Sequence, residues 1–178
     1  MSAVTPSGFD VRVGCDAQSV EDIRAAIEDS ADSGARYLRL LFSADERALI
    51  RRLTSGAEVV RYVSGRFAAK EAVFKVLRIR PDVPLPLSQI EILADEGGAP
   101  LVRFRGTARE LSIAAGVGRV TVSISHTAWF AFAVAVAVAV ETPQQAVHDR
   151  RTTSRVEFQP GDRAWPPDHG LSLRTADR

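Results

Sequence analysis

Hydrophobic and polar residues alternate with a period of two in several short segments of this chain, which is the pattern of half-buried strands. Residues 11–15 form the first such segment, and the predicted strand ends at Asp16. The other predicted strands cover residues 90–92, 101–104, 120–124 and 129–140. The last of them is an almost strict alternation of alanine with larger apolar residues, mainly valine.

Apolar residues spaced three and four apart predict the helices. Ser19 and Ser43 have the character of N-cap residues, and Glu46 completes a capping box with Ser43. The predicted helices cover residues 20–28, the segment that follows Ser43, residues 59–77 and residues 107–115. Because short turns join the later strands, these are expected to pair antiparallel. The pattern therefore predicts an α+β fold, in which an antiparallel sheet packs against the long helix.

The length of 178 residues predicts a single domain. That domain is confined to residues 11–140, because the composition changes sharply after Val140. Residues 141–178 contain few aliphatic side chains and four of the nine prolines, which predicts a disordered tail without a core. Residues 1–10 are expected to form a short flexible leader.

Charge and composition argue against several classes of protein. The net charge of +1 at pH 7 provides no strong field that would attract nucleic acid or an anionic membrane. The longest apolar run, residues 128–140, is shorter than the roughly 20 residues of a membrane-spanning helix. The single cysteine, Cys15, cannot form an internal disulfide, and the N-terminus lacks the pattern of a signal peptide. The expected compartment is the cytoplasm.

Candidate chemical groups lie in the first strand and in the long helix. Lys70 falls on a stripe of apolar residues, so its ammonium either extends to the edge of the stripe or meets an anionic partner. Glu71 precedes Lys75 by four residues, which is the spacing of a helical ion pair. Asp16 stands at a strand end shortly after Gly14, where ligand groups are often found. Taken singly, the pair could be a solvated surface pair and Asp16 a helix-start residue.

The segment Ser125-His126-Thr127 lies at the turn between the last two predicted strands. No Gly-x-Ser-x-Gly elbow accompanies it, so nucleophilic serine chemistry is discounted. The histidine could bind phosphate or satisfy its own turn. Two carboxylates together with lysine, arginine and histidine suggest Mg²⁺ and a polyphosphate. The usual glycine-rich nucleotide loops are absent from the sequence, so these phosphates would be held in another way.

Three segments in this order resemble the holo-acyl-carrier-protein synthase family of 4'-phosphopantetheinyl transferases. They are Gly14-Cys15-Asp16, Arg66-Phe67-Ala68-Ala69-Lys70-Glu71-Ala72-Val73-Phe74-Lys75 and Ser123-Ile124-Ser125-His126-Thr127. The strand-turn-strand from Ile90 to Phe104, with Asp95 and Pro100, also resembles that family. The resemblance covers about residues 11–140 and implies the 4'-phosphopantetheinyl transferase fold. It further implies an enzyme that transfers phosphopantetheine from coenzyme A to a serine of apo acyl carrier protein, releasing adenosine 3',5'-bisphosphate.

The same resemblance implies roles for individual residues. Asp16 and Glu71 would hold Mg²⁺ on the pyrophosphate of coenzyme A, and Glu71 would take the proton from the carrier serine, directly or through a metal-bound water. Lys75 would stabilise charge on the transferring and leaving phosphates. The residues expected to contact coenzyme A are Arg66, Lys70, Lys75, His126 and Thr127. Members of the short class form trimers with active sites between subunits, and the alanine-valine strand fits either such an interface or an ordinary core.

The chain departs from the family pattern at two places. Asp22 occupies a position where short members commonly carry a cation that docks the acidic carrier protein, and the nearby candidates for that role are Arg24, Arg36 and Arg39. Arg78-Ile79-Arg80-Pro81 stands where the family often has a glycine-rich turn, and its arginines could meet the 3'-phosphate. The alternatives to an enzyme are a non-catalytic homologue that binds carrier protein or nucleotide and a structural α+β domain with surface ion pairs. For an enzyme, fatty-acid and polyketide carriers both remain open.

Overall fold

The computed structural model of this chain describes residues 9–29, 31–80 and 82–140. Residues 1–8 of the predicted leader and the whole predicted tail lie outside the described residues. The elements, in chain order, are β1 (Phe9–Ser19), α1 (Val20–Glu28), α2 (Ala31–Leu41), α3 (Ala44–Ile50), α4 (Gly56–Leu77), the 3-10 helix η1 (Leu87–Gln89), β2 (Ile90–Ala94), β3 (Pro100–Phe104), α5 (Gly106–Ala114), β4 (Val117–His126) and β5 (Phe130–Val140).

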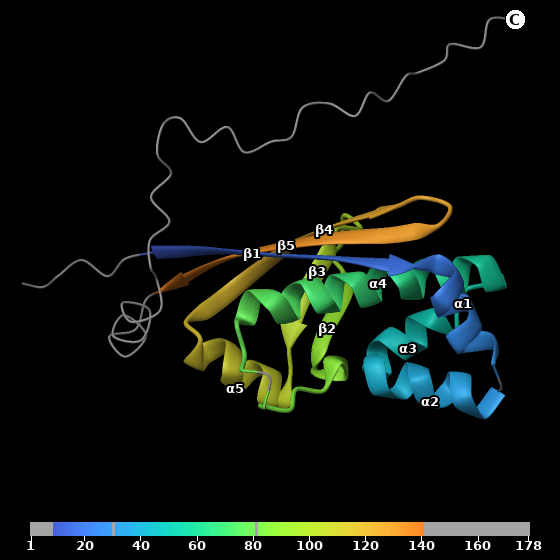
Figure 1. The fold of residues 1–178 in the computed structure, drawn as a ribbon, viewed down its shortest axis with the longest axis horizontal. Helices are drawn as coiled ribbons and strands as arrows, with labels where there is room; N and C mark the ends of the chain where they lie inside the picture. The colour runs from blue at the N-terminus through green and yellow to red at the C-terminus, as the bar shows by residue number, and fades with distance from the viewer. Residues whose placement is uncertain (1–8, 30, 81, 141–178) are drawn as a thin grey trace, which may run out of the picture. The chain divides into compact units, whose positions relative to one another are not determined.

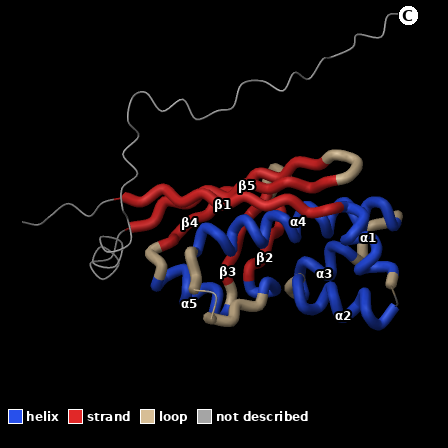
Figure 2. Tube along the Cα trace, in the orientation of Figure 1, coloured by secondary structure: helices blue, strands red, loops and turns tan. Residues whose placement is uncertain are grey.

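The strands form two antiparallel sheets, and the later strands, which short turns join, pair antiparallel as predicted. A three-stranded sheet has the order β1-β5-β4, and a two-stranded sheet pairs β2 with β3. Helix α4 runs along one face of the three-stranded sheet (Figures 1 and 2). The predicted α+β fold with an antiparallel sheet on a long helix is therefore confirmed. Within the described residues, no helix is long and apolar enough to cross a bilayer.

Two elements differ most from their predictions. The first strand begins at Phe9, within the predicted leader, and continues past Asp16 to Ser19, because Gln18 and Ser19 remain paired with Ala131 and Phe130 of β5. Helix α2 was not predicted at all: its first half is polar and contains a glycine, and the helical spacing of its apolar residues, with Tyr37, Leu38 and Leu41 three and four apart, was overlooked. Tyr37, Leu38 and Leu41 of its second half pack against a small core that α2 shares with α1, α3 and the beginning of α4.

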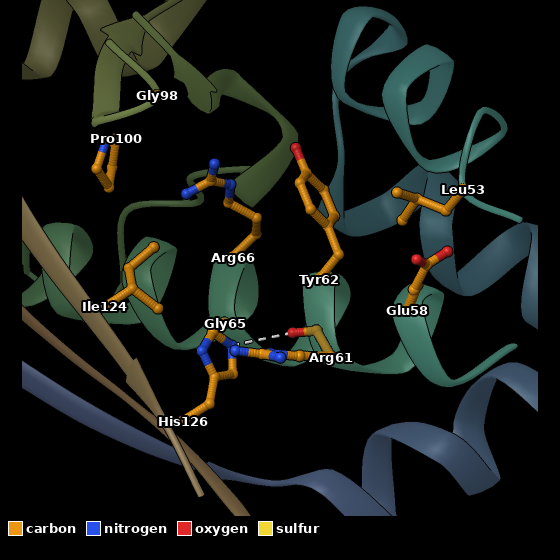
Figure 3. A pocket seen from close by; sticks show the side chains of 10 residues that line it. All are labelled: Leu53, Glu58, Arg61, Tyr62, Gly65, Arg66, Gly98, Pro100, Ile124 and His126. Atoms are coloured by element: carbon orange, nitrogen blue, oxygen red, sulfur yellow. Dashed lines mark hydrogen bonds between the residues drawn. The ribbon is translucent and has the colours of Figure 1, made fainter. Parts of the chain in front are cut away.

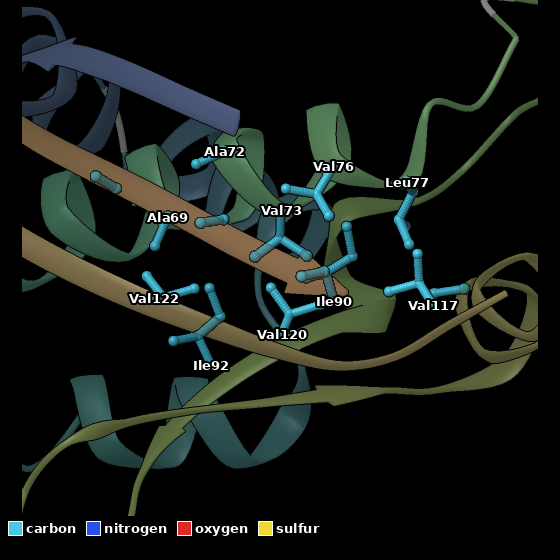
Figure 4. Packing of buried hydrophobic residues seen from close by; sticks show 14 of the residues in the cluster. Ala69, Ala72, Val73, Val76, Leu77, Ile90, Ile92, Val117, Val120 and Val122 are labelled. Atoms are coloured by element: carbon cyan, nitrogen blue, oxygen red, sulfur yellow. The ribbon is translucent and has the colours of Figure 1, made fainter. Parts of the chain in front are cut away.

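The two faces of β5 differ in side-chain size, and the smaller residues are the buried ones. Its alanines 131, 133, 135, 137 and 139 are at most 3% exposed. The alternating larger residues on the other face, from Phe130 to Val138, remain between 39% and 51% exposed. The alanine face packs against Ala69, Ala72, Val73 and Val76 of α4 (Figure 4). Small side chains on both surfaces let the helix lie close to the sheet.

Lys70 belongs to the core of the chain, and the expectation that it contacts coenzyme A is corrected by this structure. Its ammonium is fully buried and donates to Glu46 Oε2 at 2.8 Å, to the carbonyl oxygen of Leu87 at 3.1 Å and to that of Ile90. These three bonds use all three donors of the ammonium. Glu46 is also fully buried, and its other oxygen accepts the backbone N–H of Ile92 at 2.9 Å. Of the two alternatives for Lys70, the anionic partner is the one observed.

We expect Lys70→Met to lower the free energy of unfolding by about 3–5 kcal/mol, because it leaves the Glu46 carboxylate buried without its counter-ion. Urea denaturation measures this loss. The double variant Lys70→Met/Glu46→Gln should recover part of the stability, since it removes the uncompensated charge as well.

Arg80→Met is the matched control for this experiment. Arg80 bonds Asp82 at 2.9 Å, but both side chains are largely exposed, so its loss should cost at most about 1 kcal/mol. Equal losses for Lys70→Met and Arg80→Met would contradict the placement of Lys70 in the core.

Candidate active site

Glycine at position 14 lets strand β1 pass unusually close to helix α4. A Cβ atom here would lie 2.1 Å from the carbonyl oxygen of Ala72 and 3.1 Å from Cβ of Lys75, and the first of these distances is sterically impossible. Asp16 is the next residue on the same face of β1. The close approach therefore brings Asp16 to the flank of α4 on which Glu71 and Lys75 lie.

The carboxylate of Asp16 is held by two side chains. Lys75 donates from Nζ to Asp16 Oδ1 at 2.7 Å and to the carbonyl oxygen of Cys15, also at 2.7 Å. Gln18 donates from Nε2 to Asp16 Oδ2 at 2.6 Å. The ion pair that Lys75 forms is thus with Asp16 and not with Glu71, the partner considered from helical spacing. The hydrogen bond to Asp16 is the main cause that raises the pKa of Lys75.

Glu71 completes this group, which we call the carboxylate cluster: Asp16, Glu71 and Lys75. Burial raises the pKa of Glu71, and the negative charge of Asp16 raises it further, while the positive charge of Lys75 acts in the opposite direction. A carboxylate with a raised pKa accepts a proton more readily than an ordinary glutamate does. Glu71 is therefore suited to act as a general base.

The carboxylate cluster fits a divalent cation that keeps part of its hydration. In the described part of the chain there is no group of three or more His, Cys, Asp or Glu side chains that could hold a metal ion. Asp16 and Glu71 offer carboxylate oxygens on neighbouring elements, and Mg²⁺ is commonly bound by one or two carboxylates together with waters and phosphate oxygens. A cation near them would also offset the repulsion that raises the pKa of Glu71.

A hollow of about 420 Å³ is formed by α4, the end of β4 and the turn between β2 and β3 (Figure 3). Its polar and charged lining comes from Glu58, Arg61, Tyr62, Arg66 and His126, and the remaining lining residues are Leu53, Gly65, Gly98, Pro100 and Ile124. The guanidinium of Arg66 lies 5.1 Å from the centre of the Tyr62 ring. Arg66 Nε and the Tyr62 hydroxyl are buried, with no hydrogen-bond partner among the described residues. These unsatisfied groups and the cations suit an anionic ligand.

His126 lines this hollow and lies against α4 at Gly65. Its Nε2 is 3.1 Å from the carbonyl oxygen of Arg61, and a Cβ atom on Gly65 would lie only 2.4 Å from the same nitrogen. Burial lowers the pKa of His126, the bond to Arg61 opposes this shift, and the charges of Arg61 and Arg66 add to the lowering.

The carboxylate cluster and the hollow lie on different flanks of α4. Arg66 and Glu71 are five residues apart, so their side chains diverge by about 140° around the helix. Asp16 is on β1 and His126 is on β4, and strand β5 separates these two strands in the sheet. The structure therefore gathers Asp16, Glu71 and Lys75 in one place and Arg66 and His126 in another.

Thr127 has a role in the turn between β4 and β5. Its Oγ1 accepts the backbone N–H groups of Phe130 at 2.9 Å and of Trp129 at 3.2 Å. Sequence reasoning missed Arg61, Tyr62 and Gly65 as parts of the hollow. A glycine inside a helix was the available signal for Gly65. Arg61 contacts His126 through its backbone carbonyl, and such a contact cannot be predicted from the residue type.

Comparison with known proteins identifies the class. Residues 12–137 match the family model described as the 4'-phosphopantetheinyl transferase superfamily, and the chain belongs to this superfamily. A holo-[acyl-carrier-protein] synthase of Thermoanaerobacter sp. (strain X514) is 34% identical over 119 residues, which are 67% of this chain and 80% of that protein. Within the superfamily, the chain is accordingly a member of the holo-[acyl-carrier-protein] synthase family.

Further similarities cover very different shares of the other proteins. The fatty acid synthase subunit alpha of Schizosaccharomyces pombe is 50% identical over 64 residues, which are 35% of this chain but only 4% of that protein. The crystal structure of the holo-ACP-synthase from Plasmodium yoelii has a TM-score of 0.64 at 27% identity and covers 75% of this chain and 99% of that one. The Helicobacter pylori holo-[acyl-carrier-protein] synthase in complex with coenzyme A has a TM-score of 0.58 at 26% identity, with 70% and 98% covered.

We expect Gly14→Ala to lower the free energy of unfolding by about 1–3 kcal/mol, because the added methyl group must push β1 away from Ala72. It should also weaken Mg²⁺ binding, since Asp16 moves away from Glu71. Chemical denaturation and calorimetric titration with Mg²⁺ measure the two effects. Gly118→Ala is the control, because nothing lies within 4 Å of a Cβ there. Unchanged stability and Mg²⁺ affinity in Gly14→Ala would contradict the close approach.

Proposed function

We infer that this chain transfers 4'-phosphopantetheine from coenzyme A to a serine hydroxyl of apo acyl carrier protein. The products are holo carrier protein and adenosine 3',5'-bisphosphate. The observation that carries the inference is the carboxylate cluster, which lies within the matched family domain and places a lysine beside two carboxylates. The Helicobacter pylori relative with the same fold is a complex with coenzyme A, which supports coenzyme A as the substrate here.

Glu71 is the residue we assign to proton removal. The serine oxygen forms a bond to the phosphorus that carries pantetheine, the bond from that phosphorus to the leaving adenosine 3',5'-bisphosphate breaks, and the serine proton passes to Glu71. The raised pKa of Glu71 suits this task, because the ideal base has a pKa closer to the working pH than an ordinary glutamate.

Asp16 and Glu71 are the residues that would hold Mg²⁺, which supplies positive charge to the pyrophosphate of coenzyme A when bound. Lys75 gives its hydrogen bonds to Asp16 and to the Cys15 carbonyl, and half of its side chain is exposed. A cation held by Asp16 would compete with this ion pair. The Lys75 ammonium would then be free to stabilise charge on the transferring and leaving phosphates.

Glu71→Gln should keep the fold and reduce transfer at least about 100-fold, because the amide cannot accept the serine proton. Mass spectrometry of apo carrier protein incubated with coenzyme A and Mg²⁺ measures the phosphopantetheine gain. The thermal midpoint of the free variant at neutral pH should equal or exceed that of the wild type, since a carboxylate disfavoured by burial and by Asp16 is removed. Full transfer by Glu71→Gln would refute the mechanism. No transfer by the wild type to any of several carriers would favour the non-catalytic homologue.

We further propose that the chain works as a homotrimer in which neighbouring subunits share each active site. The first support is the placement of the carboxylate cluster and the hollow on different flanks of α4, so that one chain presents two half-sites. The second is the outer face of the three-stranded sheet, where Val11 and Val13 of β1 adjoin the exposed large residues of β5. A contiguous apolar surface of this kind is typical of an interface. Arg66 and His126 would then contact coenzyme A phosphates held by the neighbour's carboxylate cluster.

Mixed assemblies of two inactive variants test the shared site. Glu71→Gln and Arg66→Ala should each lose most transfer activity as pure proteins. Co-expressed with different tags and purified through both, they should regain a substantial fraction, because some sites then combine an intact cluster with an intact hollow. The double variant Glu71→Gln/Arg66→Ala, co-expressed with Glu71→Gln in the same way, should regain none, since Glu71 is lost from every chain.

Sedimentation velocity gives the independent measurement of assembly. The wild type should sediment as a trimer, and Val136→Asp on the outer face of β5 should yield folded monomers. A fully active monomeric wild type would contradict the shared site while leaving the transfer reaction itself untouched.

The carrier-docking surface is assigned to α2 and not to α1. Arg24 of α1 is already close to two carboxylates, 3.4 Å from Glu21 and 3.7 Å from Glu28. Arg36 and Arg39 of α2 are exposed and three residues apart, so they share one helix face. Their charge suits an acidic carrier protein.

The single exposed cysteine, a free thiol, agrees with the cytoplasm as the compartment.

A further inference from the structure

His126 commits one of its two ring nitrogens to the backbone. Nε2 lies 3.1 Å from the carbonyl oxygen of Arg61. A carbonyl oxygen can only accept a hydrogen bond, so Nε2 must carry a hydrogen in the neutral ring as well as in the protonated ring. Nδ1 is consequently a bare acceptor while the ring is neutral, and it becomes a donor only when the ring binds a second proton.

Gly65 is the residue that permits this arrangement. A Cβ at position 65 would lie 2.4 Å from His126 Nε2 and 2.8 Å from Cε1. Any side chain there would force the imidazole away from α4 and away from the Arg61 carbonyl. The sequence of α4 thus supplies both the space for the ring, at Gly65, and the acceptor that fixes its tautomer, one turn earlier.

The surroundings of the ring favour its neutral form while the hollow holds no anion. Burial lowers the pKa of His126, and the positive charges of Arg61 and Arg66 on α4 lower it further. Glu58, the acidic residue of the lining, accepts bonds from Thr54 and Ser55. Helix α4 also contributes Tyr62. The other neighbouring elements contribute no charged group to the lining: they present Ala131 of β5, and Gly98 and Pro100 near the β2–β3 turn.

An anion in the hollow favours the protonated form of His126 over the neutral form. A phosphate oxygen facing a bare Nδ1 meets a lone pair and is repelled, whereas a protonated Nδ1 gives a charge-assisted hydrogen bond. A phosphate also neutralises the repulsion from Arg61 and Arg66, which removes the main reason for the ring to remain uncharged apart from burial.

We propose that Gly65 and the Arg61 carbonyl are positioning elements that make His126 take up one proton when the phosphates of coenzyme A enter the hollow. The inference rests on the proposed function, because it takes coenzyme A as the ligand. The proton comes from the solvent and resides on Nδ1 in the complex, and no other bond is made or broken. Binding of coenzyme A therefore weakens as the pH rises above the pKa of His126 in the free protein.

Isothermal titration of the full chain with coenzyme A, repeated in buffers of different ionisation enthalpy, counts the protons taken up on binding. Above pH 7, the wild type should take up as much as one proton more than His126→Gln, and its affinity should fall by up to about tenfold per pH unit. The comparison with His126→Gln removes any contribution from ionisation of coenzyme A itself. Equal proton uptake by two proteins that both bind coenzyme A would overturn the inference.

The variant Gly65→Ala distinguishes a role of Gly65 in positioning His126 from a role in folding alone. Its methyl group displaces the ring, so the extra proton uptake should disappear while circular dichroism shows a folded protein. Gly56→Ala is the matched control on the same helix, because nothing lies within 4 Å of a Cβ there, and its proton uptake should equal that of the wild type.

Nuclear magnetic resonance of the imidazole nitrogens gives a test that needs no ligand. The free wild type should show the tautomer with hydrogen on Nε2, and the opposite tautomer would overturn the inference. A wild type that does not bind coenzyme A at all would instead refute the proposed function, and the inference with it.

Discussion

The contact between α4 and the alanine face of the three-stranded sheet is the constraint on which the candidate site depends. Alanine on β5 and glycine on β1 leave so little side chain between the layers that backbone atoms nearly touch at Gly14 and Ala72. This short separation brings Asp16 to the flank of Glu71 and lets the ring of His126 lie against Gly65. A larger residue in either place would move a functional side chain, so packing and chemistry are set by the same small residues.

Strand β5 buries its small side chains and exposes its larger ones. Burial of apolar surface is the main stabilising contribution in folding, so a chain acting alone would gain more by placing valine inside. With alanine inside, β5 buries less apolar surface within its own subunit. The larger residues of β5, with Val11 and Val13 of β1, form an exposed apolar surface that only contact with another molecule can remove from water.

Much of the fold and part of the site followed from the sequence. Period-two alternation and capping residues located the strands and most helices, because such patterns reflect local geometry. Helix α2 was not predicted because its polar first half and Gly34 were given more weight than the helical spacing of Tyr37, Leu38 and Leu41, which pack against α1, α3 and α4. Lys70 was misassigned to a ligand because its true partner, Glu46, lies on another helix, 24 residues earlier in the chain. Contacts through backbone carbonyls, as at Arg61, leave no trace in the residue type.

The position of α4 between two half-sites has a genetic consequence. In an assembly with shared sites, each copy of this helix forms a wall of two neighbouring sites, one through Glu71 and the other through Arg66. A copy with an inactivating substitution on one flank disables a single site, whereas a copy with substitutions on both flanks disables two. Alleles that leave the apolar sheet face intact while altering both flanks would therefore act dominantly, because their products still join healthy subunits and disable the two sites that they share with them.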